Sequence, residues 1–459
     1  MHIAVIGTGY VGLVTGACFA ELGYSVACVD KDETKVEQLR AGISPIYEAG
    51  LDEVLNRNRT RGNLRFTADV AEAVAPADVV FIAVGTPASE YDGLPDMSQL
   101  NAAIGPVARA AKEGALIVVK STVPVGTTRG VAAQLASFRP NARLEAASNP
   151  EFLRQGNAVE DFLNPDRVVI GVSSNAACEL LTRLYAPICN GHGAPLFVTT
   201  CESAEMIKYA ANSLLATKVA FINEVADICE RVGANVRDVA KGVGMDHRIG
   251  PQFLQPGPGF GGSCFPKDTL ALLGLARTAG VPAPIVQAVI ESNQVRRVRM
   301  GEKIAAACGG ELRGKTLAIL GITFKPGTDD LRESISLSLL PDLLGQGAHL
   351  RVYDPQGMKE GRRRLSGDIA WAADAYDAAA GADALVILTE WNEFRTLNLS
   401  RLRHSMAMPV IVDLRNLYKR RAMQQAGFAY YSIGRAAVTP ETGEVKDLNP
   451  VAVEEASAA

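Results

Sequence analysis

The N-terminal segment, Met1–Asp30, constrains the fold more than any other part of the sequence. An apolar stretch at His2–Ile6 is followed by a turn of the form GxGxxG, then by a helical pattern that Gly23 ends, then by a second apolar stretch at Ser25–Val29. Two short apolar strands separated by a glycine turn and a helix predict a βαβ unit. Such a unit requires a parallel sheet, because its helix carries the chain back to begin the second strand in the same direction.

The glycine turn also predicts a ligand. Gly7, Gly9 and Gly12 would let a pyrophosphate lie against backbone N–H groups at the start of the helix, where the helix dipole is positive. Tyr10 and Val11 lie within the same turn and belong to the predicted site. A glycine-rich turn without a ligand is the alternative, but the strand before it and the helix after it favour a dinucleotide site.

Asp30 indicates which dinucleotide binds. It ends the second strand, 18 residues after Gly12, where a carboxylate accepts hydrogen bonds from the adenosine ribose and repels a 2′-phosphate. The sequence therefore predicts NAD rather than NADP. Lys31 and Lys35 follow this acid closely and weaken the preference slightly.

Strand-like and helical segments alternate along most of the remaining chain. This alternation predicts an α/β fold with two Rossmann-like domains, each built on a doubly wound parallel sheet and joined by a long central helix and a helical dimerisation region. The long helix is expected at 204–233, and the further strands at Val79–Val84, Leu116–Lys120, Arg143–Ala146, Arg167–Val172, Gly314–Leu320, His349–Tyr353, Ala384–Leu388 and Val410–Asp413. The expected parts are an NAD-binding domain at 1–198, a central helical region at 199–300, a C-terminal α/β domain at 301–439 and a mobile tail at 440–459.

Composition excludes several kinds of partner. The 459 residues carry a net charge of −4 with a pI of about 5.9, which argues against binding to nucleic acid or to an anionic membrane. No apolar run reaches the ~18 residues of a membrane span, and no signal peptide is visible. The eight cysteines form no CxxC and the five histidines lie far apart, so neither a metal site nor a disulfide framework is expected. We therefore expect a cytoplasmic protein.

A glycine-rich loop at 257–268 places a cysteine among residues with little side chain. It reads GPGFGGSCFPKD, too rich in Gly and Pro for a helix or a central strand. Cys264 at its centre is either a small buried hydrophobe, the usual role of a free cysteine, or a nucleophile on a loop that cradles substrate. Lys267 could favour a thiolate or bind an anion.

Residues after the predicted strands are the next candidates, because ligands of open α/β sheets bind beyond the carboxyl ends of the strands. Thr86 and Thr122 could face the cofactor there, although a threonine after a strand is more often a helix N-cap. Glu151 is a candidate general base. Lys208 and Asn212 share one face of the long helix and are candidates for stabilising an oxyanion.

A nicotinamide cofactor implies hydride transfer, which gives Cys264 a chemical purpose. Oxidation of an alcohol yields an aldehyde, which has no alkoxide to drive a second hydride transfer. Addition of a thiolate rebuilds a tetrahedral centre as a thiohemiacetal, and its oxidation gives a thioester that water cleaves to an acid. Asp268 or Glu151 could activate that water. An alcohol dehydrogenase that stops at the aldehyde is the alternative.

Several blocks of sequence resemble one known family, the UDP-glucose 6-dehydrogenase family, in the same order and to about residue 435. The blocks are IAVIGTGYVGLVTGACFAELGYSVACVD, SPIYEAGL, KSTVPVGTT, SNPEFLRQG, IKYAANSLLATKVAFINEVADICE, GMDHRIGPQFLQPGPGFGGSCFPKD and LGITFKPGTDDLRES. The resemblance implies NAD-dependent oxidation of UDP-glucose to UDP-glucuronate, with two hydride transfers and with thiohemiacetal and thioester intermediates on Cys264. It also implies an NAD-binding N-terminal domain, a central dimerisation region and a C-terminal domain that binds the UDP group, in a homodimer or a higher homo-oligomer.

The resemblance assigns roles by matching motifs. The implied catalytic residues are the nucleophile Cys264, the oxyanion-stabilising Lys208, the pair Asn212 and Asp268 that positions the reacting oxygen and water, and the base Glu151 with Thr122 nearby. The residues implied to bind NAD are Gly7, Gly9, Tyr10, Val11, Gly12, Asp30, Lys35, Thr86, Thr122, Gln155, Lys267 and Arg332. The residues implied to bind the sugar nucleotide are Glu151, Phe152, Leu153, Arg154, Lys208, Asn212, Phe253, Leu254, Gln255, Pro256, Gly257, Gly261 and Lys325, with Arg248 reaching the substrate of a neighbouring subunit.

One position departs from the family pattern. Gln155 stands where members often have an acid, and an amide can neither act as a base nor supply a counter-charge. We still expect Gln155 near the nicotinamide, and Glu151 remains the predicted base. The alternatives within the family are dehydrogenases of GDP-mannose or UDP-N-acetylmannosamine. An alternative of another class is a catalytically silent protein that binds NAD or a sugar nucleotide.

Overall fold

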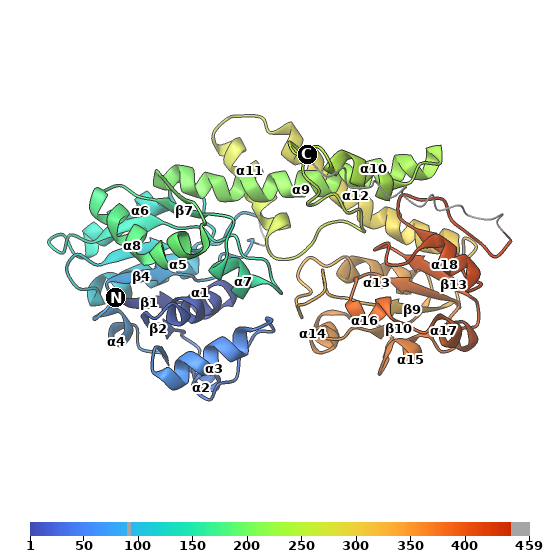
Figure 1. Cartoon of the computed structure of the whole chain (residues 1–459), viewed down its shortest axis with the longest axis horizontal. Helices are drawn as coiled ribbons and strands as arrows, with labels where there is room; N and C mark the ends of the chain where they lie inside the picture. Colours follow the sequence, from blue (N-terminus) through green and yellow to red (C-terminus); the bar gives the residue numbers. More distant parts are fainter. Residues whose placement is uncertain (90–92, 442–459) are drawn as a thin grey trace, which may run out of the picture. The chain divides into compact units, whose positions relative to one another are not determined.

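The computed structural model describes residues 1–89 and 93–441. The chain forms two compact units (Figure 1). The first contains Met1–Thr217 and Ser263–Ile290, and the second contains Lys218–Gly262 and the chain from Glu291 onward. The predicted tail at 440–459 lies outside the described residues from 442 onward. The division into four parts stays a prediction.

An eight-stranded sheet forms the centre of the first unit, with the strand order β3-β2-β1-β4-β5-β6-β7-β8. All neighbouring strands are parallel except β6 and β7, which pair antiparallel. The direction of winding reverses between β1 and β4, which confirms the predicted doubly wound sheet and marks the usual place of a ligand. The strands are β1 (His2–Ile6), β2 (Ser25–Val29), β3 (Leu64–Thr67), β4 (Val79–Ile82), β5 (Leu116–Val119), β6 (Glu145–Ser148), β7 (Val168–Gly171) and β8 (Leu196–Thr199).

Helices cover both faces of this sheet. One apolar layer packs α1, α3, α7 and α8 against one face, and a second layer packs α4, α5 and α6 against the other. Strands buried on both faces need apolar side chains at every position, as in the fully buried VVFI of β4. The helices up to the long central one are α1 (Tyr10–Glu21), α2 (Glu33–Arg40), α3 (Leu51–Arg61), α4 (Val70–Val74), α5 (Ser98–Ala110), α6 (Thr127–Phe138), α7 (Ala158–Leu163), α8 (Asn175–His192) and α9 (Cys201–Val232).

The second unit contains a six-stranded parallel sheet. Its order, β11-β10-β9-β12-β13-β14, repeats that of the first six strands of the larger sheet. Its apolar layers include residues of α9, α12 and α13 on one side and of α15 to α18 on the other. The strands are β9 (Thr316–Leu320), β10 (His349–Tyr353), β11 (Ile369–Trp371), β12 (Ala384–Ile387), β13 (Val410–Asp413) and β14 (Ala429–Ser432). The remaining helices of the chain are α10 (Val236–Gly244), α11 (Phe265–Thr278), α12 (Pro284–Ala307), α13 (Ser336–Gly345), α14 (Met358–Arg364), α15 (Ala375–Ala379), α16 (Asn392–Arg395), α17 (Leu399–Ser405) and α18 (Arg420–Gln425).

Two long helices belong to both units. The helix α9 confirms the predicted central helix, and the boundary between the units falls within α9 and again within α12. None of the helices in the described ranges combines the length and the apolar content needed to cross a membrane.

The strand predictions were incomplete at the edges of both sheets. Strands β3, β8, β11 and β14 were not predicted, and these four are the edge strands of the two sheets. The edge strand β8 exposes Phe197 and Val198, so it lacks the pattern of a buried strand. The strand expected at Arg143–Ala146 begins instead at Glu145, because Arg143 has a φ of 44°, a left-handed conformation that a strand cannot contain.

Candidate active site

The turn after β1 fits a dinucleotide phosphate. A Cβ on Gly7, whose φ is 100°, would lie 2.8 Å from the Ala83 carbonyl oxygen, and one on Gly12 would lie 1.9 Å from the Gly7 carbonyl oxygen. Internal packing therefore requires glycine at both positions. Gly9, the N-cap of α1, is different, because a Cβ there would meet no described atom within 4 Å. Glycine at this position leaves open space beside the N–H groups that begin the helix, as close approach of a phosphate requires.

Asp30 lies at the end of β2 and is held in place by several donors. Its Oδ2 accepts hydrogen bonds from the Thr8 N–H at 3.1 Å and the Thr8 hydroxyl at 2.5 Å, and it pairs with Lys35 Nζ at 3.1 Å. Its Oδ1 accepts from the Asp32 N–H at 3.1 Å. Burial raises the pKa of Asp30, but these hydrogen bonds outweigh burial and hold the pKa below its ordinary value. The carboxylate is therefore charged where a ribose-binding acid is expected.

The loops after β4 and β5 are tied together and to α9. The Thr86 hydroxyl donates to the Thr122 carbonyl oxygen at 2.8 Å. Glu205 of α9, which is 2% exposed, accepts hydrogen bonds from the Gly126 N–H at 2.6 Å, the Thr128 N–H at 2.8 Å and the Thr128 hydroxyl at 2.6 Å. Glu205 thus caps α6 from a distant helix and fixes the loop that carries Thr122. Sequence reasoning missed it, because backbone N–H partners have no signature in a sequence.

A second buried carboxylate, Glu48, was missed for the same reason. It accepts hydrogen bonds from the Gly156 N–H at 2.6 Å and the Ala158 N–H at 2.7 Å, and the Tyr10 hydroxyl also donates to it. These contacts connect the glycine turn of the predicted NAD site to the loop after β6. Gln155 lies on that loop and is half-buried.

The candidate site contains a buried ion pair between Glu151 and Lys208. Glu151, shortly after β6, has its Oε1 3.0 Å from Lys208 Nζ of α9, and its Oε2 accepts from the Leu153 N–H at 2.6 Å. Burial raises the pKa of Glu151, but the charge of Lys208 and the hydrogen bonds outweigh burial and lower it. Burial lowers the pKa of Lys208, but Glu151, with smaller contributions from Cys264 and Asp268, outweighs burial and raises it. Both groups are therefore charged at neutral pH.

Asp268 is the second buried carboxylate of the site. It lies in the first turn of α11 and is 1% exposed. Its Oδ2 accepts a hydrogen bond from Asn212 Nδ2 at 2.6 Å, and its Oδ1 pairs with Lys267 Nζ at 2.5 Å. Asn212 follows Lys208 by one helical turn, so α9 presents the amide and the ammonium on the same face.

Cys264 is the N-cap of α11 and is half-buried. Burial raises the pKa of its thiol, Glu151 and Asp268 raise it further, and Lys208 opposes them without reversing the shift. The thiol is therefore protonated at neutral pH in this structure. The sequence suggested Lys267 as the cation that favours a thiolate. In the structure Lys267 pairs with Asp268, and Lys208 is the cation that lowers the pKa of the thiol, so the role of Lys267 stays a prediction.

Most of the predicted catalytic residues come together in the first unit. Thr122 follows β5, beside Thr86. The other five are linked by hydrogen bonds, by an ion pair or by electrostatic interaction, and these are Glu151, Lys208, Asn212, Cys264 and Asp268. Their roles in a reaction stay predictions.

Several residues predicted to bind the sugar nucleotide lie in the second unit. The Gly257 N–H donates to Asn223 Oδ1 at 2.8 Å, and its carbonyl oxygen accepts from Arg296 Nε at 2.8 Å. Both polar backbone groups of Gly257 are therefore already engaged within the chain. Gly261 allows a close approach of backbone, because a Cβ there would lie 2.2 Å from the Glu333 carbonyl oxygen. The predicted residues in this unit are Arg248, Phe253, Leu254, Gln255, Pro256, Gly257, Gly261 and Lys325.

Two predicted arginines pair with aspartates nearby in sequence. Arg332, predicted as an NAD contact, lies in the second unit and pairs with Asp330 through Nη2 at 2.7 Å. Arg248 is exposed and pairs with Asp246 at 2.6 Å. The ligand contacts predicted for both arginines stay predictions.

Arg415 is a candidate ligand-binding residue that sequence reasoning missed. Its Nη2 donates to the Phe324 carbonyl oxygen at 3.0 Å, next to Lys325. A Cβ on Gly257 would lie 3.2 Å from its Nη1, so the guanidinium adjoins the glycine-rich loop. It follows the predicted strand Val410–Asp413, so a search beyond the carboxyl ends of all the predicted strands would have found it.

Three family models match most of the chain. They describe the NAD binding domain (residues 1–189), the central domain (202–295) and the UDP binding domain (318–420) of the UDP-glucose/GDP-mannose dehydrogenase family. A UDP-glucose 6-dehydrogenase of Rhizobium meliloti (strain 1021) is 50% identical over 95% of this chain and 100% of its own length. The structure of a UDP-glucose dehydrogenase from the hyperthermophilic archaeon Pyrobaculum islandicum is similar with a TM-score of 0.87 and 38% identity, over 95% of this chain and 98% of the other. The structure of a UDP-D-ManNAc dehydrogenase from Pyrococcus horikoshii is similar with a TM-score of 0.84 and 29% identity, over 95% of this chain and 100% of the other.

Proposed function

The chain belongs to the UDP-glucose/GDP-mannose dehydrogenase family, and from this premise we propose that it oxidises UDP-glucose to UDP-glucuronate with two molecules of NAD. The observation that carries the proposal is the cluster in which the Cys264 thiol interacts with a buried ammonium, Lys208, and with the carboxylates of Glu151 and Asp268. A nucleophilic thiol has no purpose in a single alcohol oxidation. It is what a second hydride transfer requires.

NAD, bound at the glycine turn and Asp30, would supply the hydride acceptor for both oxidations. In the proposed mechanism Lys208 and Asn212 stabilise the oxygen of the reacting carbon as it becomes negative. The S–C bond then forms from Cys264 to the aldehyde carbon while the C=O π bond breaks. Because the pKa of Cys264 is raised, its proton leaves during this addition, and the nearby carboxylate of Asp268 can receive it.

The second oxidation leaves a thioester on Cys264, which water must cleave. Glu151 is the proposed base that takes a proton from this water, with Asp268 and Thr122 positioning it. The C–S bond breaks, the sulfur takes a proton, and the product leaves as a carboxylate. The lowered pKa of Glu151 keeps this group in the ionised form that a general base requires.

Counting NADH per sugar tests the proposal. With UDP-glucose limiting and NAD in excess, we expect absorbance at the NADH band to reach two NADH per UDP-glucose and chromatography to find UDP-glucuronate. One NADH per sugar with trapped aldehyde would contradict the thioester mechanism. Parallel assays with GDP-mannose and UDP-N-acetylmannosamine test the substrate, since turnover of either one without turnover of UDP-glucose would overturn the assignment.

The proposal includes a homodimer that forms through α9. Leu214, Phe221 and Ile228 are 64%, 55% and 59% exposed, and their seven-residue spacing places them along one side of the helix. A row of large exposed apolar side chains favours a contact with another protein surface. The prediction that Arg248 reaches a neighbouring subunit's substrate depends on such an assembly.

Size-exclusion chromatography with light scattering tests the dimer. We expect Phe221→Glu to shift the chain toward monomer, because a carboxylate on this row cannot be desolvated without a partner charge. Lys359→Ala, at an exposed position of α14 away from this row, is the control and should leave the mass unchanged. A wild-type chain that runs as a monomer at micromolar concentration would contradict the proposal.

A cytoplasmic location is also part of the proposal. All eight cysteines are free in the structure, and the proposed reaction needs a reduced Cys264, which a reducing compartment maintains. Cell fractionation followed by immunoblotting is the measurement, and recovery of the chain from an oxidising compartment would contradict it.

A further inference from the structure

Side chains from two helices hold the beginning of the glycine-rich loop. The N–H and the carbonyl oxygen of Gly257 bind Asn223 of α9 and Arg296 of α12, each at 2.8 Å. Three residues on, the Phe260 N–H donates to Asn293 Oδ1 at 2.8 Å, and the Phe260 carbonyl oxygen accepts from Asn293 Nδ2 at 3.0 Å. The three side chains belong to residues that are at least nine-tenths buried. The loop backbone is thus bound at two points, by both of its polar groups each time.

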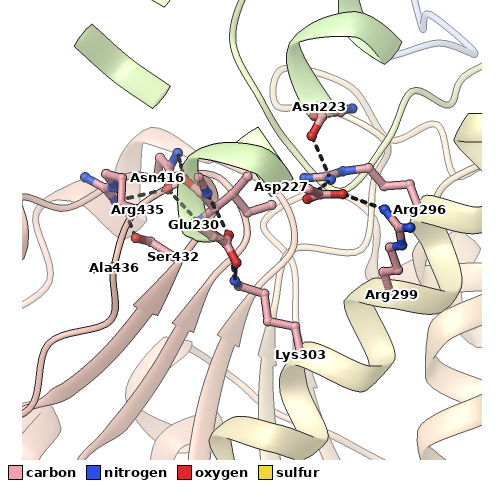
Figure 2. A network of polar contacts seen from close by, with 12 residues as sticks. Asn223, Asp227, Glu230, Arg296, Arg299, Lys303, Asn416, Ser432, Arg435 and Ala436 are labelled. Atoms are coloured by element: carbon pink, nitrogen blue, oxygen red, sulfur yellow. Dashed lines mark hydrogen bonds and ion pairs between the residues drawn. The ribbon is translucent and has the colours of Figure 1, made fainter. Parts of the chain in front are cut away.

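Arg296 is the central member of this set. Its Nη1 lies 2.6 Å from Asp227 Oδ1 and donates to the Asn223 carbonyl oxygen at 3.1 Å, so the guanidinium connects the loop to α9. Figure 2 shows Arg296 and Arg299 of α12 both directed at Asp227. The Nη2 of Arg296 is buried and has no hydrogen-bond partner among the described residues. A buried guanidinium with an unpaired NH₂ group stabilises a helix pair poorly, so its contact with Gly257 is the better explanation for its presence.

The loop needs such support because glycine makes it flexible. Between Gly257 and Gly262 four of six residues are glycine, and glycine loses more conformational freedom on ordering than any other residue. Gly259 has a φ of 118°, and a Cβ there would lie 2.8 Å from Asn293 Oδ1, so the asparagine and the glycine fit each other closely. A loop that is already held in one conformation loses little conformational freedom when a ligand binds. Its affinity for the ligand is higher for that reason.

We propose that Asn223, Asn293 and Arg296 are positioning residues that set the affinity for the sugar nucleotide. The inference rests on the proposed function and on the substrate contacts that the family resemblance implies for Gly257 and Gly261. The three side chains are enclosed by the chain and act through the backbone of 257–260. Cys264 is fixed separately, as the N-cap of α11. Loss of the supports therefore weakens substrate binding and leaves the chemical step largely intact.

Steady-state kinetics with Arg296→Met and Asn293→Ala test the inference. We expect each variant to raise KM for UDP-glucose about tenfold, the effect of losing roughly 1.4 kcal/mol of binding free energy, with kcat at saturating UDP-glucose and KM for NAD within about threefold of wild type. Arg296→Lys should recover part of the loss, because lysine can donate to the Gly257 carbonyl oxygen or pair with Asp227 but lacks the planar fork that does both. Calorimetric titration with UDP-glucose should show the same loss in Kd without turnover.

Arg299→Met is the matched control. Arg299 lies on the same helix and pairs with the same aspartate at 2.9 Å, but its side chain is 55% exposed and its contact is with Asp227. We expect its KM to equal that of wild type. Equal KM changes in Arg296→Met and Arg299→Met, or a fall in kcat with KM unchanged, would overturn the inference. A wild-type chain that neither binds nor oxidises UDP-glucose would overturn the proposed function instead, so the two failures are distinguishable.

Discussion

The Cys264→Ser variant is expected to lose formation of UDP-glucuronate by about a thousandfold or more, since a serine hydroxyl adds to an aldehyde far less readily than a thiol and makes no thioester. The variant should still bind NAD, because the glycine turn, Thr8 and Asp30 are untouched. Product chromatography and titration of NAD by fluorescence are the two measurements.

Cys178→Ser provides the control for this substitution. Cys178 lies in α8 and is partly exposed, like Cys264, but it has no part in the candidate site. This variant should keep wild-type turnover. If Cys264→Ser instead produces two NADH per sugar at a rate near that of wild type, the covalent mechanism is wrong.

The second large effect is expected from Lys208→Met. Removing one member of the buried pair leaves the Glu151 carboxylate without its counter-charge, which destabilises folded proteins by about 3–5 kcal/mol. Loss of the oxyanion stabiliser should also lower kcat by a factor of about 10² to 10³. Urea denaturation measures the first effect, and turnover of UDP-glucose measures the second.

A double variant, Lys208→Met with Glu151→Gln, separates the two effects. It should recover part of the lost stability, because the Glu151 carboxylate is no longer buried without Lys208, yet remain inactive. Recovery is partial because Glu151 also stabilises the charge of the buried Lys120. The pKa of Glu151 is lowered from 4.5 and that of Lys208 is raised from 10.5 in the folded chain. The stabilisation from the Glu151 carboxylate is therefore complete above pH 4.5, and it is lost as the pH falls through the folded-state pKa of Glu151. The stabilisation from the Lys208 ammonium is complete below pH 10.5, and it is lost as the pH rises through the folded-state pKa of Lys208.

The reactivity of the Cys264 thiol tests the electrostatic effects of Lys208 and Glu151. Lys208 lowers the pKa of Cys264 and Glu151 raises it. At a fixed pH near 8, alkylation of Cys264 by iodoacetamide should therefore be slower in Lys208→Met and faster in Glu151→Gln, because the thiolate fraction moves in opposite directions. Changes of the same sign in both variants would contradict the electrostatic description of the site.

Local contacts explain why the N-terminal part of the fold was predictable. Gly12 contacts Gly7 and Asp30 contacts Thr8 within one βαβ unit, so their spacing contains most of the information. The alternation of strands and helices predicted the inner strands of both sheets. The edge strands β8 and β11 were missed because they are only four and three residues long, too short to show a strand pattern.

The candidate site was less accessible to sequence reasoning. Spacing placed Lys208 and Asn212 on one helical face, but it could not join them to Glu151 and Asp268, since those contacts cross 57 and 56 positions of the chain. The expected chemistry and the resemblance suggested that grouping instead. The role of Glu205 could not be predicted, because it binds backbone N–H groups, which are present at nearly every position of any sequence. The pairing of Lys267 with Asp268 was also not predicted, because spacing does not show which acid a lysine contacts.

The repeated strand order means that the two sheets have equivalent positions. An aspartate follows the equivalent strand in each sheet, but its contacts differ between the two. Asp354, just past β10, occupies in the second sheet the position that Asp30 occupies in the first. Its Oδ2 accepts hydrogen bonds from the Ile322 N–H, from the N–H and hydroxyl of Thr323 and from Trp391 Nε1, and its Oδ1 accepts from the N–H groups of residues 356 and 357. Asp354 is 0% exposed, so no lone pair remains for a ribose diol. In the second sheet the acid at this position is therefore part of the internal hydrogen bonding, and a nucleotide in that unit would have to be recognised through other groups.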